Sequence, residues 1–90
     1  MKYQVNFSKP FNKSLKTMLA RGANVLLFKE AVLLLEENGV LPEYYKQHTL
    51  RGTRSGQYEA HLDDDWLIVW KQNQDKITFI DTGTHKELFQ

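Results

Sequence analysis

The sequence predicts an α+β fold in which one strand and two helices precede three further strands. Residues 3–7 alternate polar and apolar side chains as a half-buried strand does. Two amphipathic segments follow, with apolar residues at helical spacing. Residues 57–82 hold three short strands whose links are too short for parallel crossovers, so they should form an antiparallel meander. Helices followed by a run of strands favour α+β over a doubly wound sheet.

The first helix should begin after Ser8, whose hydroxyl can cap it, and end near Arg21–Gly22. Asn24 can cap the second helix, which should run to about Asn38 before the stop at Gly39. The pair would form an αα-hairpin covering one face of the sheet, which leaves the other face for a site. The expected buried stripes are Phe11, Leu15, Met18 and Leu19 on the first helix and Leu27, Ala31, Leu34 and Leu35 on the second.

Pro42 opens a loop that extends to Gly56. The three strands are expected at Gln57–His61, Trp66–Lys71 and Lys76–Thr82, with a short tail after them. Ninety residues suit a single domain, spanning 1–90. The chain has no cysteine, which excludes disulfides and thiolate metal sites. Its longest apolar run is too short for a membrane span and it shows no signal peptide, so we expect a cytoplasmic protein without a membrane partner.

The net charge is only +1, but the cations are unevenly distributed. Residues 1–29 contain no acid, and one face of the first helix carries lysines. A solvated helix surface is the simpler interpretation, and a nucleic-acid contact is the functional one. We name this set the basic surface: Lys9, Lys13 and Lys16.

The chain's three histidines, His48, His61 and His85, all lie in its second half. Imidazole can accept or donate a proton near neutral pH, so such a group suits general acid–base catalysis, although three histidines are also ordinary usage. Their spacing matches no local metal-binding motif, and we expect neither a metal nor another cofactor.

Other polar and aromatic groups lie near these histidines in the sequence. Asp65 follows His61 by four residues, and across a tight turn its carboxylate could orient that imidazole. Trp66 and Trp70 share one face of a strand; Trp70 is the better core candidate, which leaves Trp66 as a platform for base stacking. Arg51 and Arg54 occupy the glycine-bracketed loop, where they could either solubilise it or stabilise a phosphodiester transition state.

Four separated blocks together strongly resemble the YafQ branch of the RelE/ParE toxin superfamily, over essentially the whole chain. They are Tyr45-Lys46-x-His48-x-Leu50-x-Gly52, Gly56-x-Tyr58-Glu59-x-His61, Asp65-Trp66-Leu67-Ile68 and Thr82-Gly83-Thr84-His85, the last followed by Leu88-Phe89.

The resemblance implies a RelE/ParE-like fold and a type II toxin that inhibits translation. Such a toxin is an endoribonuclease that enters the ribosomal A site and cleaves mRNA there, with the ribose 2′-OH as nucleophile and no metal. The implied partners are the ribosome and its rRNA, the mRNA, and a cognate antitoxin bound as a hetero-oligomer. The positions that match the family's site are His48, His61, Asp65, Trp66, His85 and Phe89. We prefer His85 as the acid, and Phe89 or Trp66 as the stacking group.

Asp81 is a departure, because many members carry an arginine there. Arg51 or Arg54 could supply the missing cation, or activity could be reduced. Two alternatives therefore stay open: a non-catalytic ParE-like inhibitor of DNA gyrase, and a weakened toxin that acts with its antitoxin as a repressor.

Overall fold

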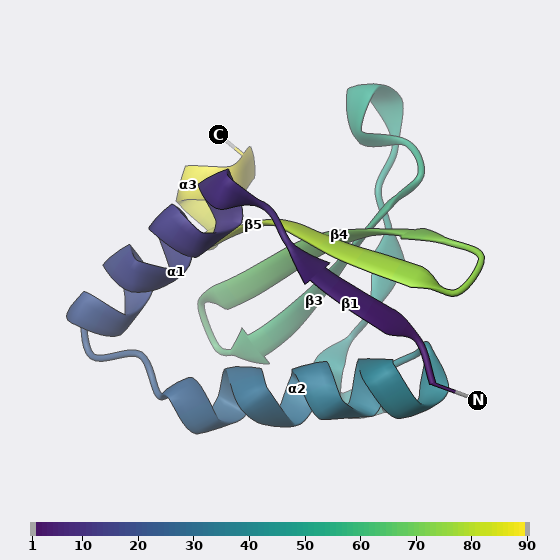
Figure 1. The fold of residues 1–90 in the computed structure, drawn as a ribbon. Coiled ribbons are helices and arrows are strands. Elements are labelled where there is room, and N and C mark those ends of the chain that lie inside the picture. The colour runs from purple at the N-terminus through teal and green to yellow at the C-terminus, as the bar shows by residue number, and fades with distance from the viewer. Residues whose placement is uncertain (1, 90) are drawn as a thin grey trace.

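The computed structural model describes residues 2–89 and has the predicted α+β class (Figure 1). A first strand and two helices are followed by four strands and a short helix. Two single 3-10 turns, Glu43–Tyr45 and Gly52–Arg54, interrupt the central loop. The elements are β1 (Gln4–Phe7), α1 (Lys9–Ala20), α2 (Val25–Asn38), β2 (His48–Thr49), β3 (Gln57–Asp63), β4 (Trp66–Asn73), β5 (Lys76–Gly83) and α3 (His85–Phe89).

The five strands form one sheet in the order β1-β5-β4-β3-β2. The meander β3-β4-β5 is antiparallel, as predicted, and β2 adds a short antiparallel edge. β1 lies beside β5 (Figure 1) and pairs with it in parallel, with Phe7 opposite Phe79. The sheet is therefore mixed rather than wholly antiparallel, because the first strand returns beside the last one.

Local capping sets the helix boundaries where the sequence placed them. The Ser8 hydroxyl accepts a hydrogen bond from the Phe11 N–H at 3.2 Å, and the Asn24 side chain accepts one from Leu26 at 3.0 Å. Gly39 ends α2 in the left-handed region, with φ 72°. A side chain at Gly39 would also overlap the Tyr3 ring, so both the turn and the packing require glycine there.

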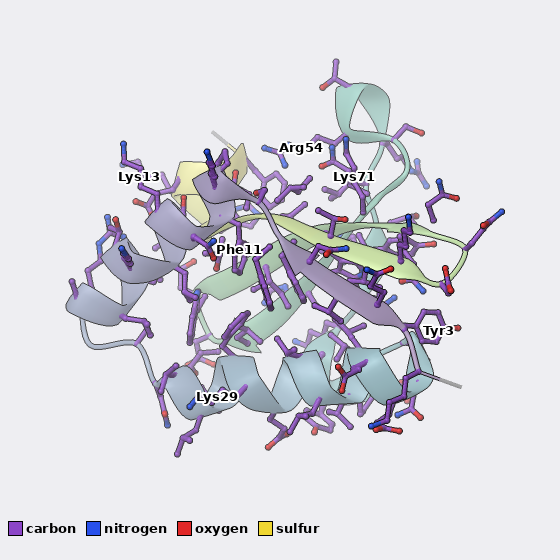
Figure 2. The ribbon with its side chains drawn as sticks, viewed as in Figure 1. Tyr3, Phe11, Lys13, Lys29, Arg54 and Lys71 are labelled. Atoms are coloured by element: carbon purple, nitrogen blue, oxygen red, sulfur yellow. The ribbon has the colours of Figure 1, made fainter. Side chains whose placement is uncertain are left out.

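Both long helices lie against the sheet, α1 on β5 and α2 on β3 and β1, and they diverge from their shared turn (Figure 1). Phe11 points from α1 into the space between the two helices and the sheet (Figure 2). Its ring centroid lies 5.3 Å from that of Phe79 and 5.6 Å from that of Phe28. Ala31 and Leu35 of the predicted stripe are fully buried, and Leu27 and Leu34 are half-buried and pack against the core. Phe28, which the sequence analysis did not select, is also buried.

The sheet presents two different faces, because side chains alternate along each strand. On β4, Trp66, Ile68 and Trp70 belong to the main core beneath the helices. Leu67 and Val69 point to the opposite face, which we call the open face; they are also fully buried, but lie outside the main core cluster. Within residues 2–89, none of the helices has both the length and the apolar character that a membrane span requires.

Candidate active site

Strand pairing brings two histidines onto the open face. His48 of β2 lies opposite Glu59 of β3, and Glu59 is in turn opposite Val69 of β4. His61 lies two residues along β3 from Glu59, so both side chains project from the same face. The row of the sheet that contains His61 continues through Leu67 of β4 to Gly83, at the end of β5. His85 comes two residues after Gly83, where α3 begins, so the third histidine follows the end of this row.

Glu59 lies between the first two imidazoles. Its Oε2 is 3.4 Å from Nε2 of His48, and its Oε1 is 3.4 Å from Nε2 of His61. The carboxylate is almost wholly buried, whereas the His48 side chain is 53% and the His61 side chain 34% exposed. Among residues 2–89, Glu59 Oε1 has no hydrogen-bond partner. A buried acceptor that lacks a partner is costly, which is typical of a functional rather than a purely structural group.

The backbone also constrains the His48 ring. Its Nδ1 lies 3.1 Å from the carbonyl oxygen of Lys46. A carbonyl can only accept a hydrogen bond, so this contact assigns the proton to Nδ1. Nε2 is then the nitrogen that can take up a further proton, and Glu59 is positioned to stabilise the cation that forms.

The third histidine belongs to α3, a helix that the sequence analysis treated as an irregular tail. The Asp65 carboxylate accepts a hydrogen bond from the backbone N–H of His85 at 2.9 Å. The ring centroids of His85 and Phe89 are 5.4 Å apart, and His85 is exposed while Phe89 is half-buried. Asp65 therefore helps to fix the start of the helix that carries His85.

Two predicted roles need correction. The carboxylate that faces His61 is Glu59, not Asp65, because β3 continues to Asp63 and the turn directs Asp65 toward α3. Trp66 is only 3% exposed, and its indole N–H donates to the Thr82 hydroxyl at 2.8 Å. A ring held in this way inside the core cannot stack on a base, so Phe89 is the one of the two candidate stacking groups that the site can use.

The two loop arginines have different surroundings. Arg54 Nη2 lies 3.7 Å from an Asp81 carboxylate oxygen, and its guanidinium lies 5.6 Å from the centroid of the Phe89 ring. Its Nη1 donates to Gln57 Oε1 at 3.3 Å. Arg51 is exposed on the loop. Arg54 thus brings a cation beside Asp81, the position at which the sequence departs from the pattern it resembles.

The basic surface belongs to α1, whereas His48 and His61 belong to β2 and β3. Lys9, Lys13 and Lys16 are all exposed on α1, and Lys13 points outward (Figure 2). None of these three lysines takes part in an ion pair with another side chain of residues 2–89. In the same described part of the chain, no group of three or more His, Asp or Glu side chains is arranged to hold a metal ion.

Sequence analysis alone did not select Glu59 as a functional residue. A single glutamate in a strand usually lies at the surface, so the residue type carried no signal. One signal was available: Glu59 and His61 are two residues apart in β3, so their side chains lie on the same face of that strand. The place of His48 on a neighbouring strand depends on a pairing that local sequence does not determine.

Comparison with known proteins identifies the family. Residues 3–90 match the model of the family described as the bacterial toxin of type II toxin-antitoxin system, YafQ. The mRNA interferase toxin YafQ of Escherichia coli strain K12 is 33% identical over 86 residues, which cover 94% of each chain.

Solved structures agree over nearly the full length. A chain of the E. coli DinJ–YafQ complex has a TM-score of 0.90 at 31% identity, covering 99% of this chain and 100% of that one. A metal-bound toxin from Helicobacter pylori has a TM-score of 0.86 at 30% identity, covering 97% and 99%. With a family match over nearly all residues and relatives above 30% identity, the chain belongs to the YafQ family of type II toxin-antitoxin toxins.

Proposed function

We propose that this protein is a ribosome-dependent mRNA endoribonuclease that cleaves mRNA in the A site by metal-free general acid–base catalysis. The observation that carries the proposal is the arrangement of His48 and His61 on either side of the buried Glu59. A surface that acted only by binding, as in a gyrase inhibitor, would have no need for two imidazoles sharing one buried carboxylate. The E. coli relative's name as an mRNA interferase supports the same reaction class.

The reaction starts with a proton transfer from the ribose 2′-OH. His48 or His61 takes this proton, and the 2′-oxygen attacks the adjacent phosphorus. The P–O5′ bond then breaks, and His85 gives a proton to the departing 5′-oxygen. The products are a 2′,3′-cyclic phosphate and a 5′-hydroxyl, so atoms and charge balance without a further reactant. Each proton transfer is worth about 10²–10⁴-fold in rate.

Glu59 and Arg54 stabilise charge during this reaction. Glu59 faces the histidine that becomes a cation when it takes the 2′-OH proton. Arg54 lies near Phe89 and can leave the half-exposed Asp81 carboxylate to contact the phosphate, which gains negative charge in the transition state. Asp65 positions His85 through its backbone N–H.

Substrate positioning depends on stacking and on the ribosome. Phe89 is half-buried beside His85 and presents a ring on which an mRNA base can stack, worth about 1–3 kcal/mol. The exposed lysines of the basic surface contact rRNA. The E. coli YafQ structure with DinJ supports a cognate antitoxin as the further partner. Because the proposed substrate is mRNA on translating ribosomes, we place the protein in the bacterial cytoplasm.

Reconstituted translation tests this function. Purified protein is added to ribosomes programmed with a defined mRNA, and cut sites are mapped by primer extension. The assay is run with and without EDTA. The EDTA is saturated with Mg²⁺ beforehand, so that it removes transition metals but leaves the ribosomes intact. We expect cuts at the A-site codon, unchanged by removal of tightly bound transition metals. Naked mRNA of the same sequence should be cut far more slowly.

Three results would contradict the proposal. Equal cleavage of naked mRNA would remove ribosome dependence. Loss of cleavage after chelation, restored by one transition metal, would remove the metal-free mechanism; the metal-bound H. pylori toxin makes this arm necessary. Absence of cleavage together with inhibition of DNA gyrase would favour the non-catalytic alternative.

A further inference from the structure

The helix that carries His85 has little apolar packing to hold it. α3 contains five residues, and none of them is fully buried. A cavity separates it from α1 and β5, lined by Ser14, Thr17, Arg21, Asp81, Glu87 and Leu88. A helix this short is not stable by itself, so other contacts must fix its position.

One of those contacts is the hydrogen bond from the His85 N–H to the Asp65 carboxylate at 2.9 Å, and a second set of polar contacts meets at Glu87. The Arg21 guanidinium donates two hydrogen bonds to the Glu87 carboxylate, at 2.9 Å to Oε1 and 2.8 Å to Oε2. Glu87 Oε1 also accepts from the Thr84 N–H at 2.9 Å, and the Thr84 hydroxyl accepts from the Glu87 N–H at 3.2 Å. Thr84 and Glu87 thus form a capping box, to which Arg21 adds a bridge from the end of α1.

The bridge differs from an ordinary surface ion pair. Most exposed pairs contribute little, but bidentate arginine–carboxylate contacts are the exception because their geometry is fixed. The Lys2–Glu37 pair gives the contrast within this chain: it has one contact of 3.3 Å, and its side chains are 68% and 54% exposed. Arg21 and Glu87 are 49% and 43% exposed, and they join segments 66 residues apart.

We propose that Arg21 and Glu87 are positioning residues for His85, and that the Arg21–Glu87 bridge sets the distance between His85 on α3 and the histidines of β2 and β3. This inference rests on the proposed function, in which His85 is the acid. Gly83 fits the same arrangement, since a Cβ there would lie 3.2 Å from Glu87 Oε1 and 3.6 Å from Leu88, so a side chain at this position would press on the Glu87 carboxylate. Reacting groups must be held within tight limits, because a displacement of about 1 Å can cost about 10²-fold in rate.

The test compares Arg21→Ala, Arg21→Lys and the matched control Lys2→Ala, which breaks the other exposed pair. For Arg21→Ala we expect kcat for ribosome-bound mRNA to fall by about tenfold, with KM within about twofold of wild type. Arg21→Lys keeps the charge but loses the second hydrogen bond, and should recover part of kcat. Lys2→Ala should leave both constants unchanged. A second readout needs no activity: amide hydrogen exchange at His85 and Leu88 should accelerate most in Arg21→Ala, less in Arg21→Lys and not at all in Lys2→Ala.

The two readouts separate the possible failures. Wild-type kcat and wild-type exchange in Arg21→Ala would overturn the proposal. A lower melting temperature with unchanged kcat, measured well below that temperature, would also overturn it, since the bridge would then serve stability alone. A raised KM with unchanged kcat would assign Arg21 to ribosome binding instead. If the wild-type protein cuts no mRNA, the proposed function fails, while the exchange measurement still decides whether Arg21 fixes α3.

Discussion

Glu59 is the residue on which the account of catalysis depends most. Its carboxylate is buried between His48 and His61, at 3.4 Å from each, and its Oε1 lacks a hydrogen-bond partner within the described part of the chain. Glu59→Gln keeps the size of the side chain but removes the charge that stabilises a histidine cation. We expect kcat to fall by at least about tenfold while the melting temperature changes little. Stopped-flow cleavage of ribosome-bound mRNA measures this, and an unchanged kcat would make Glu59 a structural residue.

The two loop arginines allow a matched comparison. Arg54 is placed beside Asp81 and Phe89, whereas Arg51 is exposed on the same loop. Arg54→Ala should lower kcat by about 10²-fold or more, as loss of a transition-state contact does, and Arg51→Ala should have a much smaller effect. Parallel measurement of both variants at saturating ribosome concentration checks this. A larger loss in Arg51→Ala would show that the other arginine reaches the phosphate.

At the scale of elements, α3 should respond to acid. The hydrogen bonds from Arg21, and next from the Thr84 N–H, lower the pKa of Glu87 to about 2 from its usual 4.5. A lowered pKa means that the carboxylate stabilises the docked helix fully above pH 4.5, and that this contribution is lost as pH falls from 4.5 toward 2. NMR shifts of the Thr84 amide, which donates to the Glu87 carboxylate, should therefore titrate in this window. Glu87→Gln is the control and should lack this transition; an identical titration in that variant would contradict the assignment.

The elements that local chemistry determines were predictable from the sequence. Ser8, Asn24 and Gly39 cap the two long helices through contacts within a few residues, so these boundaries could be identified without knowledge of the fold. α3 was missed because five residues carry almost no helical periodicity. The parallel pairing of β1 with β5 joins the two ends of the chain, and no local pattern encodes such a contact.

The candidate site was predictable in part for the same reason. The histidines could be selected by chemistry and by resemblance, but their neighbours depend on strand register. His61 was paired with Asp65 on sequence distance, whereas the alternation of β3 places Glu59 beside it. Trp66 was predicted to be a stacking group, although it lies on the same face of β4 as Trp70. The alternation of side chains that places Trp70 in the core therefore places Trp66 there as well.

At the scale of the whole molecule, charge is distributed so that a chain with a net charge of only +1 still presents a basic surface. Replacing Lys9, Lys13 and Lys16 by Glu reverses that surface at exposed positions of α1, so the fold should be kept. Binding to ribosomes should weaken strongly, and its dependence on salt should become shallower because fewer counterions are released. Sedimentation binding assays at several salt concentrations measure both effects. Equal affinity and an equal salt slope would mean that these lysines only solvate the helix.

The two faces of the sheet separate the hydrophobic core from the candidate active site. The helices and the aromatic core occupy one face (Figure 1), His48 and His61 lie on the other, and His85 begins α3 at the end of β5. In the proposed reaction this open face holds the mRNA so that a ribose 2′-OH of the mRNA is the nucleophile. Cleavage therefore needs that hydroxyl and must leave defined ends.

The most direct test uses ribosomes programmed with mRNA that carries a single 2′-O-methyl group at the nucleotide 5′ to the cut. Unmodified mRNA should give a 2′,3′-cyclic phosphate, or the 3′-phosphate formed from it, together with a 5′-hydroxyl, as read by mass spectrometry. The 2′-O-methyl mRNA should not be cut at that position. Cleavage of the modified mRNA at the unmodified rate, with a 5′-phosphate on the product, would show that water rather than the ribose attacks the phosphorus and would contradict the account.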